Sequence, residues 1–225
     1  MGEEKRDESL DPGEFYDLAS PYYDEVIMGP FKEKFTDGDE TTFLSTFFEK
    51  KSRLLDLGSG TGRSISLLMD SYDVFGVDIS KGMLRKAVKR NVRTCVLADI
   101  RRLPFQNHVF DGGFSLHGGL SHLPSMTEKK ETLEEIDRTM RPRCSILIDV
   151  PSPYREDRGD TFMVEWQAGP QTIKLRGYGW YPEEFDRILT DLDYTDIQLF
   201  GDYILDKAFD KTSRRLIIKA TREPH

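Results

Sequence analysis

The stretch that decides the fold reads Leu54-Leu55-Asp56-Leu57-Gly58-Ser59-Gly60-Thr61-Gly62. The short apolar run 53–57 predicts a strand, and the glycines behind it predict a tight turn into a helix. Glycines at such a turn also let a ligand approach the backbone more closely than a Cβ atom would permit. The stretch therefore predicts a ligand-binding loop at the carboxyl end of a sheet.

Strands and helices alternate on the C-terminal side of this loop. The expected strands are 53–57, 73–77, 92–98, 109–116 and 145–150, and the expected helices are 64–72, 80–90 and 126–140. Ser80 suits a helix N-cap, and Ser125 with Glu128 has capping-box spacing. Such alternation predicts an α/β, doubly wound, Rossmann-like fold with a mostly parallel sheet and helices on both faces.

The flanking segments interrupt or extend this pattern. We expect a flexible charged tail over 1–13 and a single domain over 14–225. Within that domain, the aromatic-rich segment 14–50 predicts a helical cap, although its aromatics, Phe31 and Phe35 among them, also suit core packing. Alternating residues over 151–181 predict an inserted antiparallel ribbon. A helix from Pro182 and closing strands near 197–204 and 214–220 complete the chain.

The composition excludes several classes of function. The chain has 225 residues and a net charge of −8, which disfavours a general nucleic-acid binder. It contains no apolar run long enough to span a bilayer, and its charged N-terminus is unlike a secretory signal. Cys95 and Cys144 lack neighbouring histidines, so we expect reduced core residues and no metal site. A cytoplasmic protein is the resulting expectation.

Three aspartates follow the first three expected strands. Asp56 precedes the first glycine by two positions, where it would repel a pyrophosphate but suit a cationic aminoacyl group. Asp78 ends the second strand and could bind both ribose hydroxyls, its alternative being a helix cap. Asp99 follows the third strand, where it could accept a hydrogen bond from an exocyclic amine beside Ile100.

The glycine loop and the three acids occur in the order and spacing found in class I S-adenosylmethionine-dependent methyltransferases of the small-molecule type. The sequence resembles that family over about residues 15–221. The resemblance implies seven strands with the last antiparallel, and S-adenosylmethionine as cofactor with S-adenosylhomocysteine as product. It places Asp56 and Gly58 at the methionine end, Asp78 at the ribose, and Asp99 with Ile100 at the adenine. The further implied contacts are Ser59, Gly60, Gly62, Ile79, Ser115 and Tyr16, of which Tyr16 could equally be packing. Arg143-Cys144 stands where the family usually has a glycine pair, a departure that affects a turn.

The acceptor side is less defined by sequence. His117, in the loop after the fourth strand, is the candidate base, its alternative being a structural loop histidine. We interpret His122 as part of the approach to the next helix. Residues that could line an acceptor site are Tyr22, Tyr23, Trp166, Arg176, Tyr178 and Tyr181. The partner is then a small molecule, with no nucleic acid or membrane, and the chain a monomer or homodimer.

Two other functions share parts of this pattern. A nicotinamide-dependent oxidoreductase would share the glycine loop and Asp78, but it predicts G-x-G-x-x-G, whereas the glycines here are Gly58, Gly60 and Gly62. A protein that binds the cofactor without transferring the methyl group would have the same cofactor site. Production of S-adenosylhomocysteine distinguishes a methyltransferase from such a binding protein.

Overall fold

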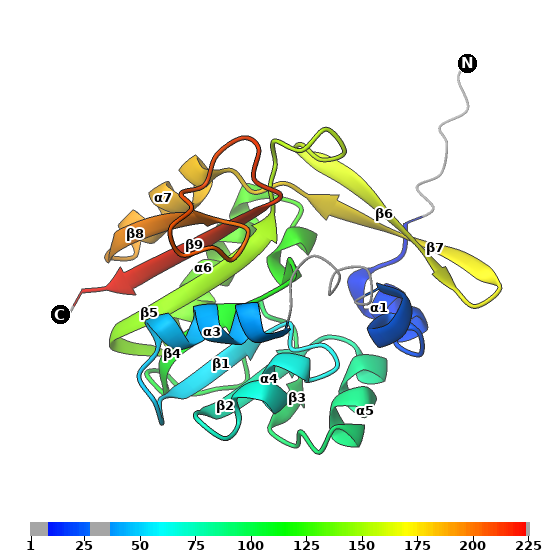
Figure 1. Ribbon diagram of the computed structural model, residues 1–225, viewed down its shortest axis with the longest axis horizontal. Coiled ribbons are helices and arrows are strands. Elements are labelled where there is room, and N and C mark those ends of the chain that lie inside the picture. Colours follow the sequence, from blue (N-terminus) through cyan, green and yellow to red (C-terminus); the bar gives the residue numbers. More distant parts are fainter. Residues whose placement is uncertain (1–8, 28–36, 224–225) are drawn as a thin grey trace.

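A computed structural model of the protein describes residues 9–27 and 37–223, and a central seven-stranded sheet dominates it (Figure 1). The strand order is β3-β2-β1-β4-β5-β9-β8. The strands are β1 (Arg53–Leu57), β2 (Asp73–Asp78), β3 (Cys95–Leu97), β4 (Phe110–Ser115), β5 (Met140–Pro151), β8 (Tyr194–Gly201) and β9 (Arg215–Arg222). Only β9 runs antiparallel to its neighbours β5 and β8 among these pairings. The predicted Rossmann-like sheet with an antiparallel last strand is therefore confirmed.

Helices cover both faces of the sheet because its strands alternate between two apolar cores. Leu54 and Leu147 belong to the core beneath α3 (Asp37–Phe47), α4 (Arg63–Leu68) and α5 (Lys81–Lys89). Leu55 and Ile146 belong to the opposite core, beneath α6 (Met126–Thr139) and α7 (Pro182–Asp191). Successive strand side chains point to opposite faces, so continuous apolar runs require two helical layers.

A separate antiparallel ribbon lies beside the carboxyl end of the sheet. It consists of β6 (Thr161–Ala168) and β7 (Gln171–Tyr178), and α1 (Pro12–Ala19) packs on it (Figure 1). Phe15 is fully buried against Trp166, with ring centroids 4.8 Å apart. The predicted insertion after the fifth strand of the sheet is confirmed, and α1 joins the ribbon to the main domain.

The N-terminal expectations need one correction. Leu10 forms a bridge with Leu175, and Asp11 caps α1, so order begins before the predicted end of the tail at residue 13. The cap itself is α1, one π-helical turn η1 (Tyr23–Ile27) and α3. Residues 1–8 and the aromatics Phe31 and Phe35 lie outside the described residues.

Element boundaries differ from the predictions at four places. The third strand spans only Cys95–Leu97, because Val92 N–H bonds the Ala87 carbonyl and completes the end of α5. The fifth strand begins at Met140, before Pro142, because Met140 pairs with Phe110 across an irregularity in β4. Helix α4 ends at Leu68, and β8 begins at Tyr194, each earlier than expected.

Candidate functional site

The glycine loop is held open against the end of β2. Gly58 and Gly60 have φ values of +77° and +55°, a left-handed region that favours glycine. The N–H groups of Gly58 and Ser59 donate to the Val77 carbonyl, each at 2.9 Å. Gly60 N–H donates to Asp78 Oδ2 at 2.7 Å. The loop therefore curves around the carboxyl ends of β1 and β2 and presents bare backbone.

A cavity of about 450 Å³ lies in front of this loop, within the size range of small-molecule sites. Its predicted lining residues are Tyr16, Tyr23, Asp56, Gly58, Ser59, Gly60, Asp78, Ile79, Asp99, Ile100, His117, Arg176 and Tyr178. Residues not predicted from the sequence also line it, including Leu10, Thr61, Arg63, Met83, Arg101 and His122. The cavity therefore joins the glycine loop, the ends of the first three strands and the ribbon.

Asp56 is a buried carboxylate without hydrogen-bond partners among the described residues. It is 2% exposed, yet it lines the cavity. Burial, and secondarily the charge of Asp78, raises the pKa of Asp56 to about 8, although Arg63 lowers it. A cationic group in the cavity would supply the partner that the carboxylate lacks. This unsatisfied acid is the feature that most restricts the ligand.

Asp78 is instead well satisfied by backbone donors. Besides Gly60, it accepts from Ser80 N–H at 2.8 Å, so the helix-capping alternative also holds. Burial raises the pKa of Asp78, while the hydrogen bonds from Ser80 and Gly60 lower it. Asp17 of α1 accepts from Ser80 Oγ at 2.6 Å and from Gly82 N–H at 2.7 Å, which ties the N-terminal helix to this edge.

Asp99 also lines this cavity, and its carboxylate forms an ion pair with Arg101. Arg101 Nε donates to both carboxylate oxygens of Asp99 at 3.0 Å, and Arg101 Nη1 donates to Glu128 at 2.8 Å. Burial raises the pKa of Asp99, but the side-chain and backbone hydrogen bonds from Arg101 lower it. The net result is a pKa below the usual value. Ile79 and Ile100 offer apolar surface in the same cavity, and Ile79 is 41% exposed.

A second cavity of about 180 Å³ adjoins the first between the ribbon and the loop after β4. Its lining residues are Tyr16, Tyr23, His117, Gly118, Ser121, His122, Pro151, Arg158, Phe162, Val164, Trp166 and Arg215. Tyr16, Tyr23, His117 and His122 line both cavities, so they stand between them. Tyr16 and Tyr23 each approach Trp166 edge to face with ring centroids 5.9 Å apart.

His122 lies in the short 3₁₀ helix η2 (Gly119–His122), and its ring faces Tyr16. Its Nε2 is 2.9 Å from Tyr16 Oη. Burial lowers the pKa of His122 to about 4, against a smaller effect of the Arg176 backbone, so its ring is neutral near pH 7. Burial raises the pKa of Tyr23 to about 12 and also that of Tyr16, so both phenols stay protonated. In the tautomer with the proton on Nδ1, the Tyr16 hydroxyl donates to His122 Nε2.

His117 belongs to a charged cluster with Glu40 and Arg63. Arg63 Nη2 donates to Glu40 Oε2 at 2.7 Å and also contacts His117 Nε2. Glu40 Oε1 lies 3.2 Å from the same nitrogen and accepts no hydrogen bond from the described residues. Glu40, Arg63 and His117 therefore form one contiguous polar cluster beside the cavity.

A buried ion pair fixes the backbone of His117. His117 has a φ of +60°, and its N–H donates to Asp149 Oδ2 at 2.8 Å. Asp149 is fully buried and accepts from Arg215 Nε at 2.6 Å and Nη2 at 2.7 Å. Tyr203 Oη donates to the same carboxylate at 2.5 Å. The ends of β5 and β9 thus set the position of the loop after β4.

Four predicted site residues lie outside both cavities. Gly62 caps α4, where an added Cβ would lie 2.9 Å from Ala87 Cβ. Ser115 is fully buried and donates to the Leu57 carbonyl at 2.9 Å. Tyr22 contacts the ribbon turn at Gly169, and Tyr181 donates to Asp160 at 2.9 Å. None of these four residues lines either cavity.

Sequence reasoning missed three residues that the fold brings to the site. Arg63 directly follows the glycine loop, and that position in the first turn of α4 could have identified it. Glu40 and His122 carry no comparable local signal, because their roles depend on contacts with Arg63 and Tyr16. The interpretation of His122 as an approach residue was incomplete, since its ring lines both cavities.

The described residues contain neither a cluster suited to a metal ion nor a helix suited to spanning a membrane. Within 9–27 and 37–223, no group of three or more His, Cys, Asp or Glu side chains is placed to hold a metal ion. Over the same ranges, no helix combines the length and apolar character that crossing a membrane requires.

Comparison with known proteins finds similarity to methyltransferases. Residues 55–148 match the family model described as a methyltransferase domain. An uncharacterised protein of Methanocaldococcus jannaschii is 28% identical over 141 residues, 63% of this chain and 52% of its own. An O-methyltransferase of Penicillium expansum is 28% identical over 161 residues, 61% of this chain and 57% of its own. The matches thus span about half the length of these relatives.

The fold also has a solved counterpart. The crystal structure of an S-adenosylmethionine-dependent methyltransferase from Clostridium acetobutylicum aligns with a TM-score of 0.74 and 14% identity. The alignment covers 92% of this chain and 99% of that one. At 14% identity, this likeness shows only that the two proteins share a fold.

Proposed function

We propose that this chain, which has the fold of the class I S-adenosylmethionine-dependent methyltransferases, binds S-adenosylmethionine in the larger cavity and methylates a small acceptor in the second. The observation that carries the proposal is Asp56, a buried carboxylate that lines the larger cavity and has no hydrogen bond from the part of the chain that the structure describes. An aminoacyl ammonium supplies the missing partner, and the open glycines admit it. The same carboxylate would repel a pyrophosphate, which argues against a nicotinamide cofactor.

The remaining residues of the cavity suit the other parts of this cofactor. Asp78 keeps lone pairs for ribose hydroxyls beyond its two backbone donors, since an ionised carboxylate accepts about four hydrogen bonds. Ile79 and Ile100 present the apolar surface that an adenine ring requires. Asp99 accepts from Arg101 but has capacity for an exocyclic amine. Tyr16 and Tyr23 separate this cavity from the acceptor cavity.

The sulfonium of the bound cofactor supplies an activated methyl group for in-line displacement, so the protein mainly orients the acceptor and excludes water. The aromatic wall of Tyr16, Tyr23 and Trp166 excludes water from the second cavity. Where the acceptor must lose a proton, we propose His117 as the base. Glu40 Oε1 lies 3.2 Å from His117 Nε2 and would stabilise the imidazolium that forms when the ring takes the acceptor's proton.

Location and assembly remain proposals of the same kind. Cys95 and Cys144 are both free thiols, which supports a reducing compartment and hence the cytoplasm. The acceptor is proposed to be a small molecule because the second cavity is only about 180 Å³. A monomer or a homodimer is compatible with a complete site in one chain.

Asp78→Ala should weaken binding of S-adenosylhomocysteine by about 1–3 kcal/mol, because it leaves ligand hydroxyls and the Gly60 N–H without their acceptor. Calorimetric titration with S-adenosylmethionine, S-adenosylhomocysteine and NADH measures this and identifies the cofactor. Binding of the first two alone supports the proposal, whereas binding of NADH alone establishes an oxidoreductase. Unchanged affinity in Asp78→Ala would remove Asp78 from the ribose site.

His117→Asn should slow methyl transfer by about 10²-fold or more and leave the affinity for S-adenosylhomocysteine unchanged. Asparagine is the suitable substitute because it tolerates the left-handed backbone of His117, whose φ is +60°. His108→Asn is the matched control, since His108 is also left-handed, with φ +57°, but lies outside both cavities. Turnover equal in the two variants would show that His117 is not the base.

Cofactor binding without methyl transfer is the second candidate function. It is favoured by the contact of Arg63 with His117 Nε2, which occupies the nitrogen of the candidate base. Incubation with S-adenosylmethionine and pools of small molecules tests it through the amount of S-adenosylhomocysteine released. Tight cofactor binding with no release above the acceptor-free rate would support a sensor or assembly role.

A further inference from the structure

The second cavity differs from the first in the charge of its walls. Asp56, Asp78, Asp99 and Glu128 line the first cavity, whereas no Asp or Glu is among the described residues that line the second. Two arginines, Arg158 and Arg215, line the second cavity instead. Such walls would leave the ammonium of an amine substrate without an ionic partner, and they attract a negative group.

The two arginines are not equivalent. Arg215 is already neutralised, because the fully buried Asp149 accepts from its Nε and Nη2. Arg158 has a weaker partner in Asp157, which accepts from Arg158 Nη1 at 2.9 Å but is 56% exposed. Asp157 is also shared with Arg155, whose Nε and Nη2 both donate to it at 2.8 Å. Arg158 therefore carries the positive charge that the local structure does not offset.

Arg158 is held in place at the edge of the cavity. Its guanidinium carbon lies 4.4 Å from the centroid of the Phe162 ring, and its side chain is only 20% exposed. Its Nε is buried and makes no hydrogen bond with the described residues. Burial, together with the charges of Arg155 and Arg215, lowers the pKa of Arg158 against the effect of Asp157. A cation in this state gains strongly from an additional anion.

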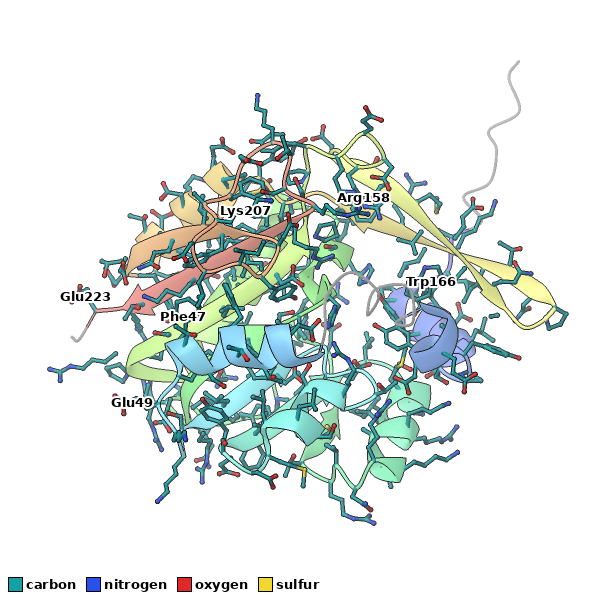
Figure 2. All side chains as sticks on the ribbon, viewed as in Figure 1. Phe47, Glu49, Arg158, Trp166, Lys207 and Glu223 are labelled. Carbon is teal, nitrogen blue, oxygen red and sulfur yellow. The ribbon has the colours of Figure 1, made fainter. Side chains whose placement is uncertain are left out.

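The second cavity is also lined by the aromatic side chains Tyr16, Tyr23, Phe162 and Trp166, and its volume suits about one ring. Trp166 of β6 lies beside α1, and Arg158 precedes β6 where the ribbon adjoins the sheet (Figure 2). A cavity of roughly 150 Å³ accommodates a benzene molecule, and this one is about 180 Å³. The Tyr16, Tyr23 and Trp166 rings offer the faces and edges with which a flat apolar ring packs well.

We propose that the acceptor is a single-ring, planar molecule carrying an anionic group such as a carboxylate, with Arg158 as the residue that binds that group. This inference rests on the proposed function, because it assigns the acceptor of the same reaction. It places the ring against the Tyr16–Trp166 wall and the methylated atom at the junction of the two cavities, beside His117. Arg158 then determines specificity and takes no part in the chemical step.

Three matched phenols test the charge preference by calorimetry on the protein saturated with S-adenosylhomocysteine. They are 3-(4-hydroxyphenyl)propanoate, 4-ethylphenol and tyramine, which share a phenol ring and differ in carrying a negative, no or a positive charge. We expect the propanoate to bind at least about tenfold more tightly than either of the others, which corresponds to 1.4 kcal/mol. Arg158→Gln should abolish that preference, and Arg158→Lys should retain part of it.

Arg155→Gln is the matched control. Arg155 donates to the same Asp157 but lines neither cavity, so its loss should leave the preference intact. Equal binding of the three phenols, or an equal effect of Arg155→Gln and Arg158→Gln, would overturn the assignment of Arg158. Absence of S-adenosylhomocysteine binding would instead contradict the proposed function, and the phenols are then titrated against the free protein with the same criterion. Thermal melting of each variant confirms that it is folded.

Discussion

Asp56→Asn is expected to weaken the binding of S-adenosylhomocysteine at pH 8 by about 2–5 kcal/mol, the usual cost of removing one partner from a buried charged pair. Asp56 is 2% exposed and has no hydrogen bond from the described residues, so the ligand ammonium would be its main partner. Asparagine keeps the shape of the side chain, removes its charge and replaces one acceptor oxygen with an amide donor. Calorimetric titration of the wild type and the variant measures the difference.

The size of this effect should depend on pH in a defined direction. Burial raises the pKa of Asp56 to about 8, so the free wild-type protein must lose a proton from this group to bind an ammonium below that pH. Its dissociation constant should then fall by up to about tenfold per pH unit from pH 6 to 8 and level off above 8. The variant lacks this slope, so the gap in affinity between the two proteins should widen as pH rises.

The raised pKa of Asp56 should affect stability in the opposite direction: the folded protein should become less stable as pH rises. A carboxyl whose pKa is higher in the folded than in the unfolded state stabilises the folded state at low pH, and this stability is lost as pH rises towards the folded pKa. For Asp56 the loss amounts to about 2 kcal/mol of unfolding free energy between pH 6 and 8 in the ligand-free protein. Asp56→Asn should remove that loss, so the variant should melt at a higher temperature than wild type at pH 8.

Asp73→Asn provides the control for both measurements, because Asp73 is half-exposed and pairs with Arg53 at the far end of β2. It should alter neither the affinity nor its pH dependence. An Asp56→Asn variant that binds S-adenosylhomocysteine like the wild type at pH 8 would show that the carboxylate does not face the aminoacyl group.

Arg215→Met is expected to destabilise the folded protein by about 3–5 kcal/mol, because it leaves Asp149 buried without its counter-ion. Asp149 is fully buried, and the Arg215 side chain is 10% exposed, so water cannot replace the lost partner. The remaining donors to Asp149 are Tyr203 Oη and His117 N–H. Urea unfolding should show a midpoint lowered by roughly 1–2 M, given typical slopes for proteins of this size.

A second variant separates the unpaired charge from the lost packing. In the double variant with Asp149→Asn and Arg215→Met, no charge is left unpaired, so part of the lost stability should return. Arg53→Met removes a comparable but exposed ion pair, whose side chains are 43% and 48% exposed, and should cost less than about 1 kcal/mol. Equal losses in Arg215→Met and Arg53→Met would contradict the assigned role of the buried pair.

Much of the fold follows from local sequence patterns. The apolar runs around Leu54 and Ile146 predict strands with two buried faces, and that pattern requires helices on both sides of the sheet. The errors lie at boundaries: Met140 and Val92 have partners far along the chain or in the preceding helix that local propensity does not encode. The antiparallel last strand came from family resemblance rather than from periodicity.

Part of the lining of the larger cavity was also accessible from sequence. Gly58, Asp56 and Asp78 sit at fixed offsets from the ends of strands, and parallel strands bring those ends to one edge of the sheet. Their chemistry therefore follows from short-range spacing. Gly62 and Ser115 carry the same local signals but serve the packing of α4 and the end of β1, which spacing alone does not distinguish.

The sequence by itself determined the layered α/β fold, the glycine loop and the acids that accompany it, because each depends on residues within one strand–loop–helix unit. Tertiary structure alone decided that His122 faces Tyr16 and that Glu40 and Arg63 flank His117. It also placed Arg158 on a cavity whose described lining residues include no Asp or Glu. These contacts join segments far apart in the chain, so the spacing of residues within one strand–loop–helix unit does not encode them.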